Sequence, residues 1–264
     1  MNSINHRMPV LFIGHGSPMI AIEESIFTKG FETIAKELPK PKAVVCISAH
    51  WETHGVFVTF MAHPRTIHDF GGFPCELYKL QYPAPGDPAL AQEIRQLVHS
   101  VEVGEDYDWG LDHGCWSVLK YLFPLADVPV VELSIDYAKP ASFHYALAKE
   151  LLPLRKEDVM IIASGNIIHN LRAIDWPHID TPNYGYDWAQ KVHEEMIDKI
   201  VTGDHQYLID DVGRNREYHL AIPTSEHYIP LLYALALQEQ DDHLSIFNDS
   251  IVGGSLDMTS LMFS

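Results

Sequence analysis

Hydrophobic residues along the chain form short continuous runs that alternate with longer segments of mixed polarity. Short apolar runs rich in β-branched side chains are typical of strands buried on both faces. The runs are Val10–Ile13, Ala43–Ser48, Val56–Phe60, Val128–Leu133 and Val159–Ala163. We expect each of them to form a buried strand.

The segments between these runs carry apolar side chains at the spacing of an amphipathic helix. The predicted helices are Ile22–Leu38, Pro88–His99, Trp116–Phe123, Ser142–Leu152, Tyr186–Val201 and Pro230–Gln238. Strands that alternate with helices predict an α/β fold, with a central mixed β-sheet flanked by helices on both faces. Within the last segment, Ser245–Phe263, we expect Ile251–Gly253 to return one more strand to this sheet.

The chain has the size and composition of one globular domain. Its 264 residues are 47% hydrophobic and 20% charged, with no internal repeat or linker, so we expect a single domain over residues 1–264. The cysteines are Cys46, Cys75 and Cys115, an odd number without Cys-x-x-Cys spacing. They predict neither a disulfide framework nor a cysteine zinc site.

The charge of the chain excludes several classes of partner. Lys and Arg total 18 against 36 Asp and Glu, which gives a formal net charge of −18. Such a field repels nucleic acid and anionic lipid. The apolar stretch from Pro9 to Ile13 is too short for a signal peptide, and no window approaches a membrane span. We therefore expect a cytoplasmic protein without a nucleic-acid or membrane partner.

Histidine is abundant, with 16 residues, and some of these follow predicted strands. His15, His50 and His169 lie shortly after Val10–Ile13, Ala43–Ser48 and Val159–Ala163. Ligands of α/β proteins bind beyond the carboxyl ends of the strands. One such histidine alone is more often structural, but three together favour a metal site, because neutral imidazole is the commonest metal ligand.

Other catalytic patterns are weak or absent in the sequence. There is no Gly-x-Ser-x-Gly motif, and the glycines around His15 do not have the spacing of a phosphate-binding loop. Cys115 is too close to His113 in sequence for the two to form a nucleophile–base pair. We expect the histidines in polar or helical surroundings to be solvated; they are His54, His63, His99, His178, His193, His205, His219 and His243.

Several motifs rich in histidine, glycine and proline occur in order along nearly the whole chain. They are Gly14–Pro18, Ser48–Trp51, His68–Pro74, Tyr82–Gly86, Asp112–Gly114, Gly165–Asn170 and Pro223–Tyr228. Together they resemble the 4,5-DOPA extradiol dioxygenase family, within the class III ring-cleaving enzymes related to protocatechuate 4,5-dioxygenase. The likeness is greatest to the bacterial members.

This resemblance implies one divalent metal ion per chain, Zn²⁺ or Fe²⁺, held by His15, His50 and His227, with His169 at or beside it. His227 comes from the resemblance alone, since its position predicts a turn residue before a helix. Its neighbour Glu226 stays open as the third ligand, because non-heme iron sites usually contain a carboxylate. If both catechol oxygens and O2 bind a six-coordinate iron, three positions remain for protein. We therefore expect His169 to be displaceable or an acid–base group.

The resemblance also implies roles around the substrate. His113 would bind or deprotonate a catechol hydroxyl, and His68, Asp69 and Tyr82 would line the pocket. The expected reaction opens a catechol such as L-DOPA with O2 to a muconic semialdehyde. The alternatives are a zinc-dependent hydrolase and a non-catalytic metal-binding protein like the Memo proteins. The sequence leaves the oligomeric state open.

Overall fold

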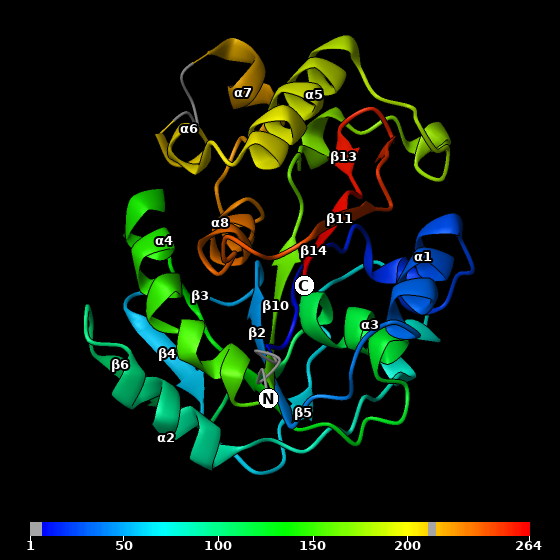
Figure 1. The fold of residues 1–264 in the computed structure, drawn as a ribbon. Coiled ribbons are helices and arrows are strands. Elements are labelled where there is room, and N and C mark those ends of the chain that lie inside the picture. Colours follow the sequence, from blue (N-terminus) through cyan, green and yellow to red (C-terminus); the bar gives the residue numbers. More distant parts are fainter. Residues whose placement is uncertain (1–6, 211–214) are drawn as a thin grey trace.

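A mixed six-stranded β-sheet runs through the middle of the molecule in the computed structural model, which describes residues 7–210 and 215–264 (Figure 1). In sheet order its strands are β11 (Leu244–Phe247), β14 (Ser260–Phe263), β1 (Val10–Gly14), β10 (Val159–Gly165), β2 (Ala43–Ser48) and β8 (Val130–Glu132). The strands β1, β10, β2 and β8 are parallel, whereas β14 is antiparallel to both β1 and β11. The parallel strands therefore end at one common edge.

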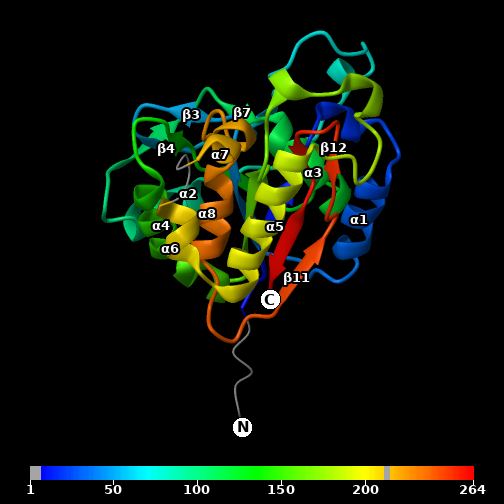
Figure 2. The same cartoon turned by 90° about the horizontal axis from the view of Figure 1, so that it is seen from above.

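Helices cover both faces of this sheet because its strands are apolar on both sides. Along β1, Val10 and Phe12 point into one hydrophobic core and Leu11 and Ile13 into the other, as the alternation of a strand requires. The first core is covered by α2 (Pro88–Leu97), α4 (Ala141–Glu150), α5 (Asp187–Thr202) and α8 (Ile229–Ala236). The second is covered by α1 (Ile26–Ala35) and α3 (His113–Leu122), which lie on the opposite side in both views (Figures 1 and 2). The predicted fold class is confirmed.

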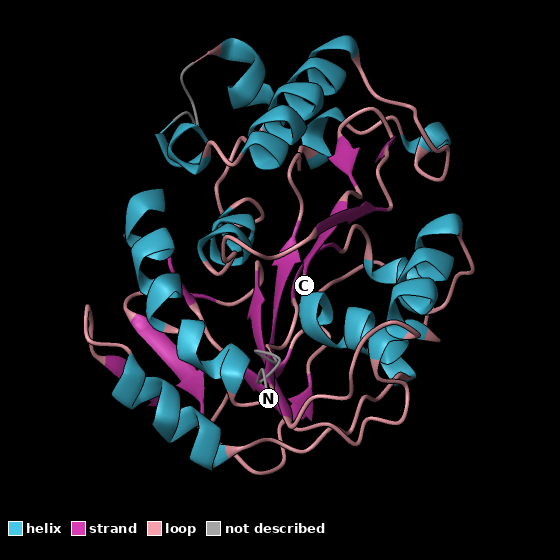
Figure 3. Cartoon of the chain, viewed as in Figure 1, coloured by secondary structure: helices cyan, strands magenta, loops and turns pink. Residues whose placement is uncertain are grey.

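Short elements complete the chain around these layers (Figure 3). Two short helices are α6 (His205–Asp210) and α7 (Arg216–Ala221). The two-stranded pairs are β3 (Glu52–Thr53) with β9 (Ile135–Asp136), β4 (Val56–Thr59) with β6 (Val103–Asp106), β5 (Arg65–Thr66) with β7 (Gly110–Leu111), and β12 (Ile251–Val252) with β13 (Leu256–Asp257). Within the described residues, no helix is both long enough and apolar enough to cross a membrane.

Most predicted elements are present, and two strands have other partners than expected. The run Val56–Phe60 forms β4, which pairs with β6 outside the central sheet. An apolar run predicts that a strand forms, but it does not predict which strand pairs with it. Ile251–Gly253 does not return to the sheet either. Gly253 and Gly254 have positive φ values of 55° and 80° and turn the chain into the β12–β13 hairpin. The strands that return are β11 and β14.

Helix ends follow the capping residues. The predicted helices Pro88–His99, Ser142–Leu152, Tyr186–Val201 and Pro230–Gln238 correspond to α2, α4, α5 and α8. The first predicted helix is shorter than expected, because a capping box of Ser25 and Thr28 starts α1 at Ile26. Conversely, α3 begins at His113 rather than Trp116, because the Asp112 carboxylate accepts from the backbone N–H of Cys115.

Candidate metal centre

The carboxyl ends of β1 and β2 flank the end of β10, and a histidine follows each of these two flanking strands. Gly14 of β1 pairs with Gly165 of β10, and Ser48 of β2 pairs with Ser164. His15 comes directly after β1, and His50 comes two residues after β2. The fold thereby brings the two imidazoles together, with His50 Nε2 3.0 Å from His15 Nε2.

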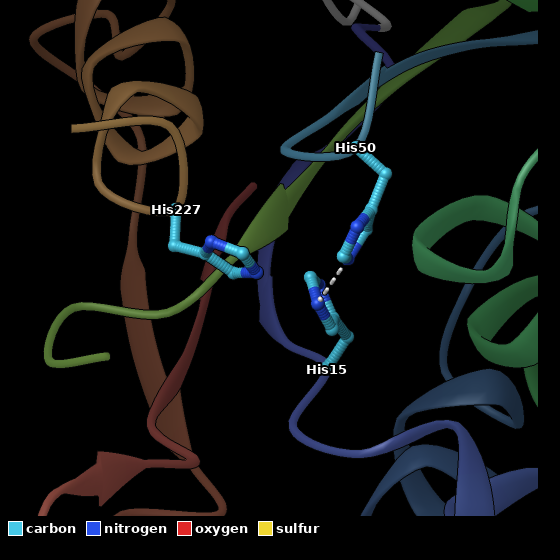
Figure 4. A group of neighbouring side chains, drawn as sticks. All are labelled: His15, His50 and His227. Atoms are coloured by element: carbon cyan, nitrogen blue, oxygen red, sulfur yellow. Dashed lines mark hydrogen bonds between the residues drawn. The ribbon is translucent and has the colours of Figure 1, made fainter. Parts of the chain in front are cut away.

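A third histidine reaches the same place from the residues just before α8. The carbonyl oxygen of His227 accepts a 2.8 Å hydrogen bond from the backbone N–H of Asn166. A Cβ atom on Gly165 would collide with that carbonyl, so only glycine allows this approach. The His227 ring then points toward His15 and His50, and one ligand atom of each of the three lies within 4.8 Å of the others (Figure 4).

The Nδ1 atoms of these rings have oxygen partners outside the cluster. Ser164 donates its hydroxyl hydrogen to the carbonyl of Gly114 at 2.6 Å. Its oxygen, 3.0 Å from His15 Nδ1, must therefore accept from the ring. In the same way, His227 Nδ1 lies 3.1 Å from Glu226 Oε1. With a hydrogen on Nδ1, each of these rings keeps the lone pair on Nε2.

His50 follows the same pattern through a longer contact. Its Nδ1 lies 3.5 Å from Asp69 Oδ2. With Nδ1 protonated, its Nε2 and that of His15 direct two lone pairs at each other across 3.0 Å. A cation relieves this repulsion, and hydrogen-bonded Nδ1 atoms are typical of metal-binding histidines.

Burial keeps these imidazoles in the neutral form that binds metal. Loss of hydration holds the pKa of His15 and of His50 well below the ordinary value, and the neighbouring histidines lower both further. The pKa of His227 is also lowered by burial, although Glu226 opposes this shift. The donor set therefore fits a divalent metal of the kind that imidazole prefers, such as zinc or iron.

His169 lies beside this group in a different geometry. Its ring stacks on the ring of His227, with centroids 3.5 Å apart and an angle of 7° between the planes. His169 also belongs to a second group of possible ligands, with Glu226 and His227, whose ligand atoms lie within 4.8 Å of one another. Burial and the charge of His227 lower the pKa of His169 to about 3. His169 thus lies directly beside the group of His15, His50 and His227.

His113 and Asp69 form a pair on the other side of His50. The ring centroids of His113 and His50 are 3.8 Å apart. Asp69 accepts from the backbone N–H of His113 at 2.9 Å, and its other oxygen lies 2.8 Å from His113 Nδ1. Burial alone would raise the pKa of Asp69, but the hydrogen bonds and charge of His113 lower it. The ionised carboxylate holds a hydrogen on Nδ1 and leaves Nε2 of His113 as the basic atom.

The residues that were expected to line the substrate pocket do not all lie together in the structure. His68 Nε2 donates to the carbonyl of Leu80 at 3.0 Å, and its ring lies edge-on to Phe70. Phe70 in turn lies edge-on to His113 at 5.5 Å, so the loop that carries His68 and Asp69 borders the site.

Tyr82 packs away from the histidines, and its expected role at the substrate stays a prediction. It is buried in the core beside α3, and its hydroxyl donates to the carbonyl of Phe123 at 2.9 Å. No described contact links Tyr82 to the histidines. An aromatic residue in a motif does not reveal from sequence whether its ring faces a pocket or the core.

Three histidines expected to be solvated are half-buried and paired instead. His193 lies between Asp257 and Asp249, His178 contacts Asp175, and His205 contacts Tyr145 and Gln238. Their partners lie on other elements or turns, which the local polarity of the sequence does not show.

Hydrogen bonds from residues that had no predicted role in the sequence also position the site histidines. These residues are Ser48, Ser164 and Gly114. Ser48 and Ser164 end β2 and β10, so their proximity to the strand-end histidines was the available signal.

Comparisons with known proteins find relatives along nearly the whole chain. Residues 9–253 match the family described as the catalytic LigB subunit of aromatic ring-opening dioxygenase. The 4,5-DOPA dioxygenase extradiol of Escherichia coli strain K12 is 43% identical over 258 residues, which cover 97% of this chain and 94% of that protein. The 4,5-DOPA dioxygenase extradiol of Beta vulgaris is 34% identical over 273 residues, covering 100% and 99%.

A solved structure shows the same fold. The crystal structure of an uncharacterized protein from Escherichia coli K12 superposes with a TM-score of 0.83 at 38% identity, covering 98% of this chain and 100% of that one. The family match spans most of the chain, and the relatives span nearly all of it. The chain therefore belongs to the LigB family of catalytic subunits of aromatic ring-opening dioxygenases.

Proposed function

We propose that this protein opens the ring of a catechol, such as L-DOPA, with O2 by extradiol cleavage, using one divalent metal ion at His15, His50 and His227. The observation that carries the proposal is the convergence of the three rings, with an oxygen partner for each Nδ1 atom. A bound divalent metal supplies a Lewis-acid site for the catechol oxygens, and iron, unlike zinc, also supplies the redox chemistry that O2 requires.

The role of His113 follows from its pairing with Asp69. With Nδ1 protonated and held by the carboxylate, Nε2 accepts the proton of a catechol hydroxyl. Asp69 then stabilises the resulting imidazolium, as a carboxylate does behind a catalytic histidine. The aromatic ring of Phe70 lies edge-on to His113 and borders this side of the site.

His169 has a separate role in the proposal. Stacked on His227, it adds a neutral imidazole beside the ligands without occupying a ligand position. As a neutral ring beside the site, His169 would accept a proton during turnover and return it afterwards. A six-coordinate metal held by three protein ligands would have three positions left for both catechol oxygens and O2.

The zinc hydrolase alternative has less support. Such an enzyme needs a carboxylate that is free to act as a base on water, and Glu226 is the nearest candidate. Its Oε1 is already within hydrogen-bond distance of His227 Nδ1 and of the Thr224 hydroxyl. Burial opposes ionisation of Glu226, but these partners lower its pKa to about 2, which makes it a poor base.

The test is metal reconstitution coupled to oxygen consumption. Apoprotein loaded with Fe²⁺ under anaerobic conditions should consume O2 and form a yellow product when a panel of catechols is added. Zinc-loaded protein should bind the same catechols without consuming O2. The variants His15→Ala and His50→Ala should lose both metal and activity. No turnover of any catechol by the iron-loaded protein would overturn the proposal.

A further inference from the structure

A second group of buried polar side chains lies behind the histidines and has no part in the proposed chemistry. Asp112 precedes α3 and Glu132 ends β8, and both are 0% exposed. Glu132 Oε1 accepts from the backbone N–H of Asp112 at 2.9 Å, and the two carboxyl groups also interact side chain to side chain. The two carboxyl groups thus share one buried environment without access to solvent.

The contacts of this pair leave one oxygen of each carboxyl without a donor. Asp112 Oδ1 accepts from the Ser48 hydroxyl at 2.7 Å and from the backbone N–H of Cys115 at 3.1 Å. Asp112 Oδ2 and Glu132 Oε2 are buried and have no donor in the part of the chain that the structure describes. Among the described residues, neither carboxyl forms an ion pair with lysine or arginine. Two ionised carboxylates in this place would be uncompensated charges, which are costly to bury.

We propose that Asp112 and Glu132 share one proton, with Glu132 as the neutral acid that donates to the Asp112 carboxylate, and that this pair positions the site histidines. Its positioning role rests on the function proposed above. Asp112 is the ionised member because it accepts from both Ser48 and Cys115, whereas within residues 7–210 and 215–264 the Glu132 carboxyl accepts only from Asp112. Burial, reinforced by the charge of Asp112, holds the pKa of Glu132 well above its ordinary value.

The first turn of α3 transmits this interaction to the metal centre. His113 follows Asp112 directly. The Ser48 hydroxyl, which donates to Asp112, lies 3.2 Å from the backbone N–H of His50 and accepts from it. Gly114 packs so closely here that a Cβ atom would lie 2.5 Å from Ser48 Oγ and 2.9 Å from His50 Cδ2.

The same turn also contacts Ser164 of β10. The Gly114 carbonyl accepts from Ser164, whose oxygen accepts from His15 Nδ1. A displacement of this turn by charge repulsion would therefore move His113 and disturb both His15 and His50. One shared proton removes that repulsion and satisfies both orphaned oxygens.

The proton itself can be detected without metal or substrate. Infrared spectra of the apoprotein at pH 7 should contain a C=O stretching band of a protonated carboxylic acid that shifts in D2O. The band should vanish in Glu132→Gln and persist in the control Glu102→Gln, which changes an exposed carboxylate. Absence of the band in the unmodified protein, or its persistence in Glu132→Gln, would overturn the proposal.

The positioning role is tested by measuring kcat and KM of the iron-loaded enzyme. Glu132→Leu removes both the acceptor for Asp112 N–H and the donor to its carboxylate. We expect kcat to fall about tenfold or more with little change in KM, as for other residues that orient a metal site from behind. Glu132→Gln keeps an acceptor and a donor, and it should restore most of that loss.

Equal loss of kcat in the leucine and glutamine variants would overturn the proposed donor role, and so would a folded leucine variant with unchanged kcat. If the leucine variant fails to fold, the glutamine variant and the infrared band still decide the proposal. A protein that shows the band but opens no catechol would refute the proposed function and leave the shared proton in place.

Discussion

At the scale of single residues, the site depends on which ring nitrogen of each histidine carries the hydrogen. Oxygen acceptors on Ser164, Glu226 and Asp69 take the Nδ1–H of His15, His227 and His113. The cluster is built from neutral rings, because burial lowers the pKa of the ligands. These acceptors, more than the histidines alone, distinguish a metal site from a chance gathering of imidazoles.

Ser164 provides a test at this scale. In Ser164→Ala, His15 Nδ1 loses its acceptor and the ring is free to take the other tautomer, with hydrogen on Nε2. Affinity for zinc should fall by about 10–100-fold, the usual effect of removing such a partner. Calorimetric titration of the apoprotein measures this. The exposed control Ser100→Ala should bind like the unmodified protein, and equal affinity of the two variants would contradict the role of Ser164.

At the scale of elements, the end of β10 and the turn before α8 must lie in backbone contact for His227 to reach His15 and His50. Gly165 permits this contact, since its Cα faces the carbonyl of His227. The glycine of the motif Gly165–Asn170 is therefore needed for a steric reason, which is separate from the role of the histidine in the same motif.

Gly165→Ala should displace the turn that carries His227. We expect the free energy of unfolding to fall by about 1–3 kcal/mol, as for overpacking in a dense region, and the affinity for metal to fall with it. Urea denaturation and zinc titration measure the two effects. The control is Gly71→Ala, where a Cβ atom meets nothing within 4 Å. A Gly165→Ala protein as stable as this control would contradict the steric argument.

At the scale of the whole molecule, ion pairs connect the C-terminal segment to helix α5 near the site. His193 of α5 lies 2.8 Å from Asp257 Oδ2 and 3.1 Å from Asp249 Oδ1. Asp257 also donates its backbone N–H to the carbonyl of Ile168, next to His169. Seen from above, α5 lies beside these C-terminal strands (Figure 2).

This connection predicts a pH dependence of stability. Burial alone would lower the pKa of His193, but the hydrogen bond and charge of Asp257, with the charge of Asp249, raise it above the ordinary value. A raised pKa in the folded state means that the stabilisation is complete below the unfolded pKa of about 6.5 and is lost as pH rises through the folded pKa.

The variant His193→Gln should therefore lose most stability near pH 6 and little near pH 9, relative to the unmodified protein. Denaturation curves at both pH values test this, with the exposed His219→Gln as control. A loss of stability that is the same at both pH values would show that His193 acts through packing rather than charge.

The sequence by itself determined the alternation of strands and helices, and it placed His15 and His50 at strand ends, because both follow from local hydrophobic periodicity. It did not determine strand partners, as β4 and β12 show. His227 could be predicted only from the resemblance to a family, since it precedes a helix rather than following a strand.

Only the tertiary structure decided how the side chains of the site are arranged, because their decisive contacts join residues far apart in the chain. The stacking of His169 on His227, the burial of Tyr82 away from the site and the pairing of Asp112 with Glu132 are all of this kind. Packing brings together the partners that set tautomers and protonation, and no local pattern in the sequence encodes which partners meet.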